Sequence, residues 1–369
     1  MTFWEWIGLA NAAILFAAVA ILLANRRTAP RIRSRHTMTD PVKFVSVLVP
    51  VRDEMENLPS VLDAWMRVEH PDWEMIVLDD GSVDGSLEYL RERAREFPRL
   101  QVVQGLPLPE GWRGKNWACH QLWERAKGEL LLFCDADVSP APQALVATAA
   151  LLEAERAGLV SGFGRQKSTH PLIGSVVSLV VDLPLRACLP LRLAADRPET
   201  SLVAAVGQWM MYTRQAYQAI GGHRAVANLV SEDLALARKG KRAGLKVVAA
   251  LAEEVLEVRM YRSSGQVWTG FVKNFADLGG GGVPGWLAAM AFVAWVYVLP
   301  VVLLVAGAGW GSALPAVLLA ILVALAAPGL ATGIRNLAWF PVGAPFLVGI
   351  GLRSALNPFW PVAWKGRAL

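Results

Sequence analysis

The chain has 369 residues, enough for one large or two ordinary domains. Hydrophobic residues make up 54% of it, and the mean hydropathy of +0.37 is high for a soluble protein. The formal net charge of +5 needs no nucleic-acid partner, and the three cysteines lack the C-x-x-C spacing of a zinc site. The composition therefore indicates a membrane partner rather than nucleic acid or structural zinc.

The apolar residues concentrate at the two ends of the chain. Phe3–Leu23 has about the 20 residues that cross a bilayer, and five arginines follow it between Arg26 and Arg35. Because positive charge marks the cytoplasmic side of a span, we expect residues 1–25 to be a transmembrane helix and the next domain to be cytoplasmic. A cleaved signal peptide is disfavoured, since no basic segment precedes the run and no small-x-small site follows it. Residues 285–369 are expected to hold two or three spans and a basic tail, the candidates being Gly285–Ala308, Ser312–Ile334 and, more weakly, Leu337–Leu356.

Between these ends, residues 42–264 show alternating strand and helix patterns. Apolar, β-branched runs at Lys43–Val51, Trp73–Leu78 and Glu129–Cys134 predict buried parallel strands, with amphipathic helices between them. This alternation favours βαβ units in a doubly wound α/β sheet, in which ligands bind beyond the carboxyl ends of the strands. Further helices are predicted at Pro59–Val68, Ser86–Phe97, Lys115–Ala126, Pro142–Ala157, Arg214–Ile220 and Glu232–Ala243, and further strands at Leu100–Val103, Gly158–Gly162 and Val203–Tyr212.

Two segments differ from this alternation. Leu172–Leu193 is apolar but interrupted by charged residues and prolines, so we expect it to lie on the membrane surface rather than to cross the membrane. Residues 265–284 are expected to form an interfacial linker that ends in a flexible hinge at Gly279–Gly282.

Three acidic clusters lie where predicted strands end or a helix begins. Charge at the end of a buried strand is costly unless it faces a cleft that holds a cation or a substrate. A D-x-D pattern supplies hard oxygens that suit Mg²⁺ or Mn²⁺, with water and phosphate oxygens completing the shell. The spacing therefore predicts group transfer from a nucleotide-linked donor. The clusters are Asp79-Asp80, Asp135-Ala136-Asp137 and Glu232-Asp233.

Each cluster also has a structural interpretation, because Asp-Gly-Ser favours turns and acidic residues at a helix start compensate the helix dipole. The chemistry nevertheless requires a base for an acceptor hydroxyl. A metal-bound Asp137 cannot supply it, so we assign Asp233 as the base, with Glu232 beside it. Lys115 is either a solvated lysine at a helix start or a phosphate ligand. His223, after a Gly-Gly break, is either structural or in contact with substrate.

Taken together, these stretches resemble the family 2 glycosyltransferases of the GT-A fold. The resemblance covers about residues 45–248 and rests on VSVLVPVRDEMENL, IVLDDGSVDGS, GKNWAC, GELLLFCDADV, GQWMMYTRQAYQAIGGH and LVSEDLALARKGKRAG. It continues less tightly through RMYRSSGQVWTGFVKN and AWKGR. The chain is most similar to the bacterial membrane-bound branch that glycosylates isoprenoid lipids, namely the hopene-associated and carotenoid-acid glycosyltransferases.

This resemblance implies a Rossmann-like mixed sheet and an inverting transfer of one sugar from a UDP-sugar to a carotenoid or hopanoid lipid. The reaction would take place at the cytoplasmic leaflet of the inner membrane of a bacterium, with the protein crossing the membrane several times. Mg²⁺ or Mn²⁺ is the implied cofactor. The implied ligands of base and ribose are Pro50, Arg52, Glu54 and Asp79; those of diphosphate and metal are Asp135 and Asp137; the implied base is Asp233; Gly207, Gln208 and Trp268 border the sugar and acceptor. We add Asp80 and Lys115 to the nucleotide-sugar site, and His223 to the sugar and acceptor pocket.

One motif of the wider superfamily is missing. Processive polysaccharide synthases carry Q-x-x-R-W after the acidic pair, whereas Gln266-Val267-Trp268 has no arginine between glutamine and tryptophan. This favours transfer of a single sugar, with a polysaccharide synthase as the alternative. A polyprenyl phosphate or a ceramide-like lipid is the alternative acceptor. A non-catalytic membrane scaffold is least favoured, because none of the acidic positions is lost.

Overall fold

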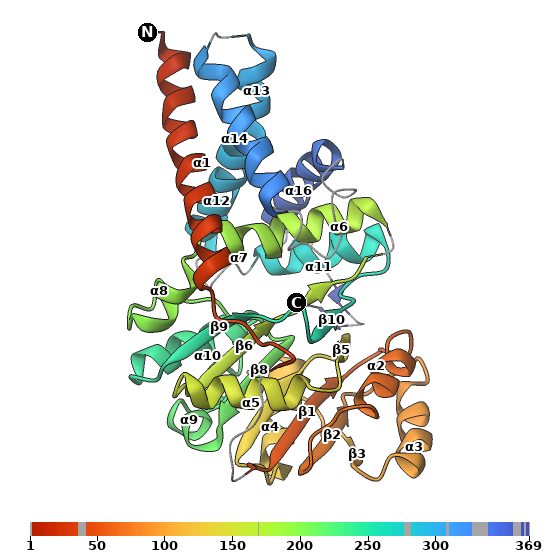
Figure 1. Ribbon diagram of the computed structural model, residues 1–369. Coiled ribbons are helices and arrows are strands. Elements are labelled where there is room, and N and C mark those ends of the chain that lie inside the picture. The colour runs from red at the N-terminus through yellow and green to blue at the C-terminus, as the bar shows by residue number, and fades with distance from the viewer. Residues whose placement is uncertain are drawn as a thin grey trace. The chain divides into compact units, whose positions relative to one another are not determined.

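The computed structural model describes residues 2–35, 42–168, 170–276, 282–307, 310–326, 339–356, 363–364 and 367–368. It divides into two compact units (Figure 1). The sheet unit comprises Pro30–Arg165 and Leu191–Met260, and the helical unit comprises Met1–Ala29, Gln166–Pro190 and Tyr261–Leu369. Most of the segment that we expected on the membrane surface therefore groups with the apolar helices of the two chain ends.

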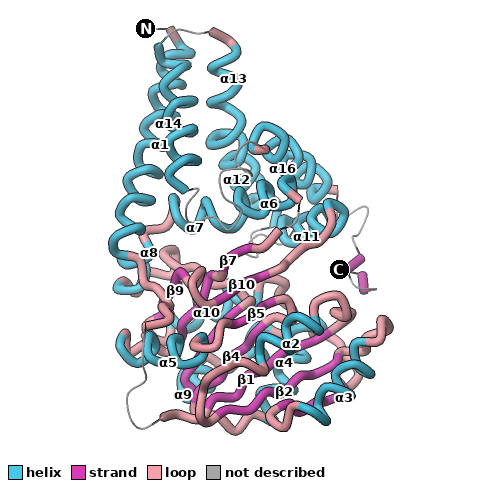
Figure 2. The backbone as a smooth tube through the Cα atoms, turned by 45° about the vertical axis from the view of Figure 1, so that its right-hand side comes forward, coloured by secondary structure: helices cyan, strands magenta, loops and turns pink. Residues whose placement is uncertain are grey.

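Seven strands form the main sheet of the sheet unit, in the order β3-β2-β1-β4-β8-β6-β9. The neighbours β2, β1 and β4 can be followed in Figure 2. The strands β3, β2, β1 and β4 pair parallel to one another, whereas β8 lies antiparallel between β4 and β6. The sheet is therefore mixed, as the resemblance implied. The strands are β1 (Val45–Val51), β2 (Trp73–Asp79), β3 (Leu100–Gln104), β4 (Leu130–Cys134), β6 (Leu159–Phe163), β8 (Trp209–Thr213) and β9 (Val247–Leu251), and β5 (Val138–Pro140) pairs separately with β10 (Leu256–Val258).

Helices cover both faces of this sheet. Val47 and Val49 of β1 belong to one core with helices α2 and α5, whereas Leu48 belongs to another with α4 and α10. Because successive side chains of a strand point to opposite faces, both faces of β1 are buried, which explains its continuous apolar sequence. The helices of this unit are α2 (Leu58–Trp65), α3 (Ser86–Glu96), α4 (Gly114–Arg125), α5 (Ala144–Ala154), α8 (Leu191–Asp196), α9 (Arg214–Ala219), the 3₁₀ helix η2 (His223–Val226) and α10 (Glu232–Arg242).

Three indole rings join helices and strands in the first of these cores. Trp65 of α2 is fully buried and stacks on Trp209 of β8, with ring centroids 5.7 Å apart and planes inclined by 12°. Trp73 of β2 also packs against the ring of Trp65, with ring centroids 5.6 Å apart. The indole N–H of Trp209 donates to the hydroxyl of Thr148 on α5 at 3.1 Å. These contacts hold the end of β8 that leads into the candidate site.

The helical unit contains the apolar ends of the chain. Among the residues described in the structure, two helical stretches are long and apolar enough to cross a membrane. They are Phe3–Thr28, with 26 residues, and Pro284–Val305, with 22 residues, which runs through the consecutive elements α12, η4 and α13. The second predicted span is helical only up to Ala326 in the described part of the chain, and residues 327–338 and most of the predicted hinge lie outside that part. The elements are α1 (Phe3–Thr28), β7 (Arg165–Gln166, at the junction of the units), α6 (Pro171–Val177), η1 (Ser178–Asp182), α7 (Leu183–Ala187), α11 (Ser264–Ala276), α12 (Gly282–Val293), η4 (Ala294–Val298), α13 (Leu299–Val305), α14 (Trp310–Ala326), α16 (Phe340–Ala355), β11 (Ala363–Trp364) and β12 (Arg367–Ala368).

Polar residues inside α1 find partners within this unit. The side-chain amide of Asn11 donates to the carbonyl of Trp295 at 2.6 Å. The amide of Asn25 donates to the carbonyls of Arg186 and Leu189 at 2.9 and 2.7 Å. Because η4, α7 and Leu189 just after α7 supply these acceptors, the two asparagines tie α1 to other segments of the unit.

Candidate active site

The carboxyl edge of the sheet carries most of the predicted site residues. β1, β2 and β4 are parallel neighbours, so the chain leaves all three at the same edge. Two helix starts contribute to the site as well. Lys115 lies in the first turn of α4, and Glu232 is the first residue of α10. Ser231 occupies the N-cap position of α10 as predicted, but its side chain makes no capping hydrogen bond.

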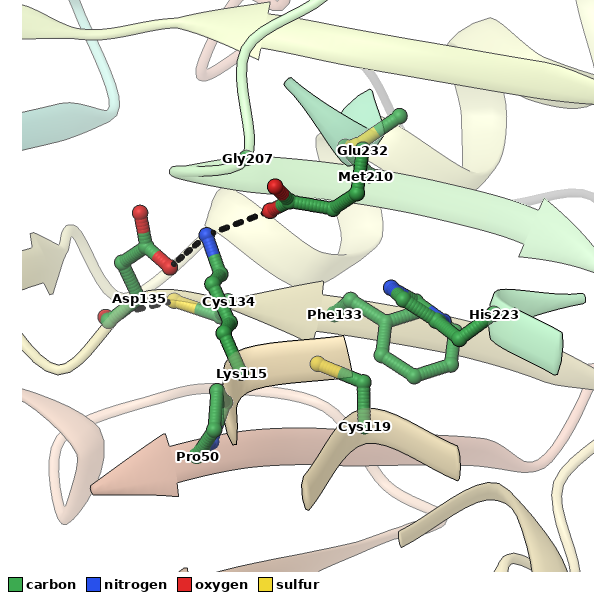
Figure 3. A pocket seen from close by; sticks show the side chains of 10 residues that line it. All are labelled: Pro50, Lys115, Cys119, Phe133, Cys134, Asp135, Gly207, Met210, His223 and Glu232. Carbon is green, nitrogen blue, oxygen red and sulfur yellow. Dashed lines mark hydrogen bonds and ion pairs between the residues drawn. The ribbon is translucent and has the colours of Figure 1, made fainter. Parts of the chain in front are cut away.

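The ammonium of Lys115 lies between two carboxylates. Its Nζ is 2.8 Å from Oδ1 of Asp135 and 2.9 Å from Oε1 of Glu232 (Figure 3). Burial alone would lower the pKa of Lys115, but the charges of Asp135 and Glu232 outweigh it and hold the pKa well above its usual value. A permanent positive charge is thereby fixed at the D-x-D strand, next to the position expected for a diphosphate.

Gly207 lies at the centre of this charged group. A Cβ atom at this glycine would be 2.6 Å from Nζ of Lys115, 3.3 Å from Oε1 of Glu232 and 3.7 Å from Oδ2 of Asp135. The backbone N–H of Gly207 donates to Oδ2 of Asp233 at 2.9 Å. Four charged residues from three distant parts of the sequence therefore surround one glycine, and a side chain there would collide with the ammonium.

Two backbone N–H groups orient the carboxylate of Asp233. Its Oδ2 accepts from Gly207, and its Oδ1 accepts from the N–H of Leu234 at 2.7 Å. Burial, followed by the charge of Glu232, raises the pKa of Asp233 to about 6, although Lys115 acts in the opposite direction. A carboxylate with a pKa close to neutrality is suited to accept a proton near physiological pH.

The carboxylate of Asp79 forms a second part of the site, at the end of β2. It is 1% exposed, and its Oδ2 accepts the N–H groups of Gly81 and Ser82 at 3.1 and 3.2 Å. Within the described residues, its buried Oδ1 has no hydrogen-bond partner. Buried acceptors in native proteins are normally satisfied, so this oxygen indicates a ligand with an N–H or O–H group.

The loops after β1 and β2 are interlocked by hydrogen bonds that the sequence analysis missed. Asp53 has a φ of +49°, an uncommon conformation for a residue other than glycine. Its N–H donates to Oγ of Ser82 at 2.9 Å, and its Oδ1 accepts the N–H of Val83 at 2.8 Å. The N–H of Met55 donates to Oδ2 of Asp84 at 2.9 Å. The Asp and Ser residues of GSVDGS indicated a turn, but nothing in the local sequence indicated a partner loop about 30 residues away.

Four other predicted residues lie beside these loops. Pro50 is near the end of β1 and lines the pocket shown in Figure 3. The guanidinium of Arg52 donates to the backbone carbonyl of Asp80 at 2.7 Å, and it lies 3.9 Å from the side-chain carboxylate of Asp80. The carboxylate of Glu54 accepts from the amide of Asn57 at 2.8 Å.

The pocket next to Lys115 has a volume of about 240 Å³, including its open mouth. His223, a predicted pocket residue, lines it, whereas Gln208 is buried beside it and its carbonyl accepts the N–H of Asp135 at 3.3 Å. The sequence analysis did not name Cys119, Phe133 or Met210, which only the folded chain brings to this cavity. The lining residues are Pro50, Lys115, Cys119, Phe133, Cys134, Asp135, Gly207, Met210, His223 and Glu232.

Trp268 belongs to α11 of the helical unit. Its ring meets Phe346 of α16 edge to face, with centroids 5.3 Å apart, and lies against Gly349. Its assignment to the acceptor pocket stays a prediction.

The chemistry of the D-x-D residues fits a divalent cation. No group of three or more His, Cys, Asp or Glu side chains that could hold a metal occurs in the described parts of the chain. Asp135 and Asp137 nevertheless provide hard carboxylate oxygens, and Asp135 is partly neutralised by Lys115. These residues fit Mg²⁺ or Mn²⁺ if diphosphate and water supply the remaining ligands.

A mixed sheet with acidic clusters at its carboxyl edge is the GT-A architecture of glycosyltransferases that use nucleotide-sugar donors. The fold is similar to that of the mannosyltransferase PcManGT from Pyrobaculum calidifontis, solved in complex with GDP-Man and Mn²⁺, with a TM-score of 0.58. The two are 21% identical, and the match covers 97% of this chain and 99% of that one. The family model of glycosyl transferase family 21 matches residues 9–366, so the chain belongs to this family. The predicted family 2-type glycosyltransferase is thereby confirmed, whereas the isoprenoid-lipid branch stays a prediction.

Curated relatives match about a third of the chain. Glycosyltransferase AglE of Haloferax volcanii is 31% identical over 127 residues, which are 34% of this chain and 40% of that protein. The undecaprenyl-phosphate 4-deoxy-4-formamido-L-arabinose transferase of Pectobacterium carotovorum is 34% identical over 110 residues, 29% of this chain and 32% of that one. The beta-monoglucosyldiacylglycerol synthase of Trichormus variabilis is 29% identical over 133 residues, 35% of this chain and 28% of that one. The chain thus spans less than half the length of these relatives.

Proposed function

We propose that the protein transfers one sugar from a UDP-sugar to an isoprenoid-type lipid, such as a carotenoid or hopanoid, at the cytoplasmic leaflet of a bacterial inner membrane. The observation that carries this proposal is the convergence of Lys115, Asp135, Glu232 and Asp233 on Gly207. In this proposal Lys115 is the fixed cation, Asp135 the D-x-D carboxylate and Asp233 the near-neutral base. Transfer from a diphosphate donor to a hydroxyl requires these three kinds of group.

The base acts on the acceptor. Asp233 takes the proton of the acceptor O–H while that oxygen forms a bond with the anomeric carbon of the sugar. The bond from the anomeric carbon to the diphosphate breaks on the opposite side, and its electron pair leaves with the nucleoside diphosphate. The configuration of the anomeric carbon is therefore inverted. The N–H groups of Gly207 and Leu234 hold the carboxylate in place during this step.

Positive charge stabilises the leaving group. The ammonium of Lys115 can turn from Asp135 and Glu232 towards the developing charge of the diphosphate without leaving the site. A divalent cation held by Asp135 and Asp137 would supply further neutralisation of that charge. Loss of one such electrostatic group typically lowers kcat by about 10²–10³-fold.

The nucleoside is assigned to the end of β2. The buried Oδ1 of Asp79 can accept an N–H of the base, and Arg52, Asp80 and Glu54 lie on the adjoining loops. A uracil offers an imide N–H of this kind, which supports a UDP-sugar as donor. We note that the similar mannosyltransferase was solved with GDP-Man, so GDP-sugars belong in the test.

Several observations support a lipid acceptor at a membrane. Two apolar helices are long enough to span a bilayer, and Arg26 and Arg27 in the last turn of the first favour a cytoplasmic sheet unit. One of the relatives is named for undecaprenyl phosphate, itself an isoprenoid lipid, and another for a diacylglycerol product. Protease accessibility of tags at either end of the chain would test whether the protein crosses the membrane more than once.

The experiment is a donor panel on membranes that contain the protein. Radiolabelled UDP-glucose, UDP-galactose, UDP-N-acetylglucosamine and GDP-mannose are incubated with total bacterial lipid, and the organic phase is counted. We expect label in the organic phase with a UDP-sugar and none with Asp233→Asn membranes. An aqueous polymer would support a polysaccharide synthase instead, and nucleotide binding without any transfer would support a non-catalytic scaffold.

A further inference from the structure

His223 is a buried imidazole that uses only part of its hydrogen-bonding capacity. It is 3% exposed and begins the 3₁₀ helix η2. Its Nδ1 lies 2.6 Å from the hydroxyl oxygen of Tyr217, and its backbone N–H donates to the same oxygen at 3.0 Å. Its other ring nitrogen, Nε2, forms no hydrogen bond with the residues that the structure describes. A polar atom of this kind lining a pocket is available to a ligand.

Gly222 makes the contact with Tyr217 possible. A Cβ atom at Gly222 would lie 2.6 Å from Cε1 and 2.9 Å from the hydroxyl of Tyr217, and the φ of this residue is +52°. Only glycine has room for the phenol ring at this distance and adopts this conformation without strain. The Gly-Gly break before His223 therefore serves to bring the two side chains together.

The hydroxyl of Tyr217 determines which ring nitrogen of His223 carries the proton. Its oxygen already accepts the backbone N–H of His223, so its own proton is free to be donated. The acceptor that the surrounding described residues offer to it is Nδ1. A neutral imidazole with an accepting Nδ1 carries its proton on Nε2. Burial, followed by the charge of Lys115, lowers the pKa of His223 to about 3, so the ring is neutral at physiological pH.

We propose that the Nε2–H group of His223 donates a hydrogen bond to one hydroxyl oxygen of the transferred sugar, which makes His223 a residue that determines donor specificity. This inference rests on the proposed function. His223 lines the same cavity as Lys115, Asp135 and Glu232, which are assigned to the reacting end of the donor (Figure 3). Tyr217 acts through His223 by fixing its tautomer and is a positioning residue.

The character of the cavity favours a sugar over the lipid tail or the diphosphate. A hydroxyl both accepts and donates, and the cavity offers the donor of His223 and the carboxylate of Glu232. Phe133 and Met210 supply apolar surface for the C–H face of a sugar ring. A diphosphate would meet the cation of Lys115 rather than a neutral ring.

The test compares the preferred sugar donor with analogues that each lack one hydroxyl. For the wild type, kcat/KM should fall by about tenfold or more with one particular deoxy donor, because the N–H of His223 is left without its acceptor. In His223→Phe, kcat/KM for the parent donor should fall by a similar factor, while the value for that deoxy donor changes less than about twofold. His223→Gln should restore part of the discrimination, because its amide provides an N–H group.

The outcomes separate the inference from the function on which it rests. Equal losses for all donors in His223→Phe and His223→Gln would overturn the inference, because a merely structural role does not depend on one hydroxyl. A wild type that transfers no sugar from any parent donor would overturn the proposed function. Independently, ¹⁵N spectra of the five histidines, assigned with His223→Gln, should show the Nε2–H tautomer for His223 from about pH 5 to 8. An Nδ1–H tautomer or a protonated ring in that range would contradict the assignment.

Discussion

The backbone N–H of Gly207 donates to the carboxylate of Asp233 across 2.9 Å, which connects the segment before β8 with the start of α10. This bond holds the carboxylate of Asp233 beside the glycine at which Lys115, Asp135 and Glu232 meet. The candidate base and the candidate diphosphate site therefore share one anchoring residue. The predictions below change each partner of this arrangement separately.

Asp233→Asn should abolish most of the turnover while preserving the binding of nucleotide. The amide oxygen of asparagine can still accept the N–H of Gly207, but it cannot take a proton from the acceptor. We expect kcat to fall by about 10²–10⁴-fold. The dissociation constant of the nucleotide, measured by calorimetry, should stay close to that of the wild type. Asp63→Asn, the same change at a carboxylate that is 58% exposed on α2, is the control and should be fully active. Near-normal turnover of Asp233→Asn would show that another group is the base.

The pH dependence of kcat should report the raised pKa of Asp233. The base works only when it is ionised, and burial together with the charge of Glu232 moves its pKa upwards to about 6. Below that pH the carboxyl holds its proton and cannot accept another. We therefore expect kcat to rise as the pH increases through about 6 and to level off above pH 7. An acid limb near pH 4, the ordinary value for an aspartate, would mean that the rate does not depend on this buried carboxyl.

Gly207→Ala should weaken donor binding without unfolding the protein. Its methyl group would lie 2.6 Å from Nζ of Lys115, so the ammonium must leave its place between the two carboxylates. We expect the KM for the donor to rise about tenfold or more, because the methyl group takes up space beside the ammonium, where the diphosphate is assigned. Gly265→Ala, where the nearest heavy atom is 3.9 Å away on the exposed surface of α11, is the matched control. An unchanged KM in Gly207→Ala would rule out Lys115 as a diphosphate ligand.

Removal of divalent metal should stop the transfer reversibly. We expect EDTA to abolish the reaction and Mg²⁺ or Mn²⁺ to restore it, as hard carboxylate oxygens bind these ions. Asp137→Asn should raise the metal concentration needed for half-maximal rate by about tenfold or more. A chelated enzyme that keeps its full rate would show that the charge of Lys115 is sufficient and that Asp135 and Asp137 hold no cation.

The core of the sheet unit should depend on its stacked indoles. Trp65 is fully buried between Trp73 and Trp209, so Trp65→Ala should lower the free energy of unfolding by about 3–5 kcal/mol. Met66→Ala, at a neighbouring side chain that is 43% exposed, should change it by less than about 0.5 kcal/mol. Urea titration of the detergent-solubilised protein, followed by tryptophan fluorescence, would measure both. Equal stability of the two variants would contradict the structural role of the stack.

The sequence predicted the alternation of strands and helices well, because both faces of the parallel strands are buried and leave continuous apolar runs. It was less informative where small or polar residues form strands. Val203–Tyr212 was expected to be one strand, but only its second half, within Trp209–Thr213, pairs in the sheet, since the first half leads Gly207 into the site. The alanine-rich β9 was not predicted, because alanine favours helices and Val247–Leu251 becomes a strand only by pairing with β6.

The candidate site could be predicted only as far as local patterns allow. Acidic residues after apolar strands indicated Asp79 and Asp135, because charge in such positions needs a partner, and an acidic pair at a helix start indicated Asp233. Contacts between distant segments were not visible, such as the bonds of Asp53 with the loop after β2. These contacts depend on strand order, and no local pattern encodes which loops meet at the edge of the sheet.

The most direct test of the account is the intact mass of the product lipid. Purified protein is incubated with the preferred UDP-sugar and a defined isoprenoid lipid, and the extract is analysed by mass spectrometry alongside an Asp233→Asn reaction. The account predicts that the lipid gains the mass of one sugar residue with the wild-type protein and gains nothing with the variant. A ladder of several sugars, or an unmodified lipid while the nucleotide sugar is consumed, would contradict it.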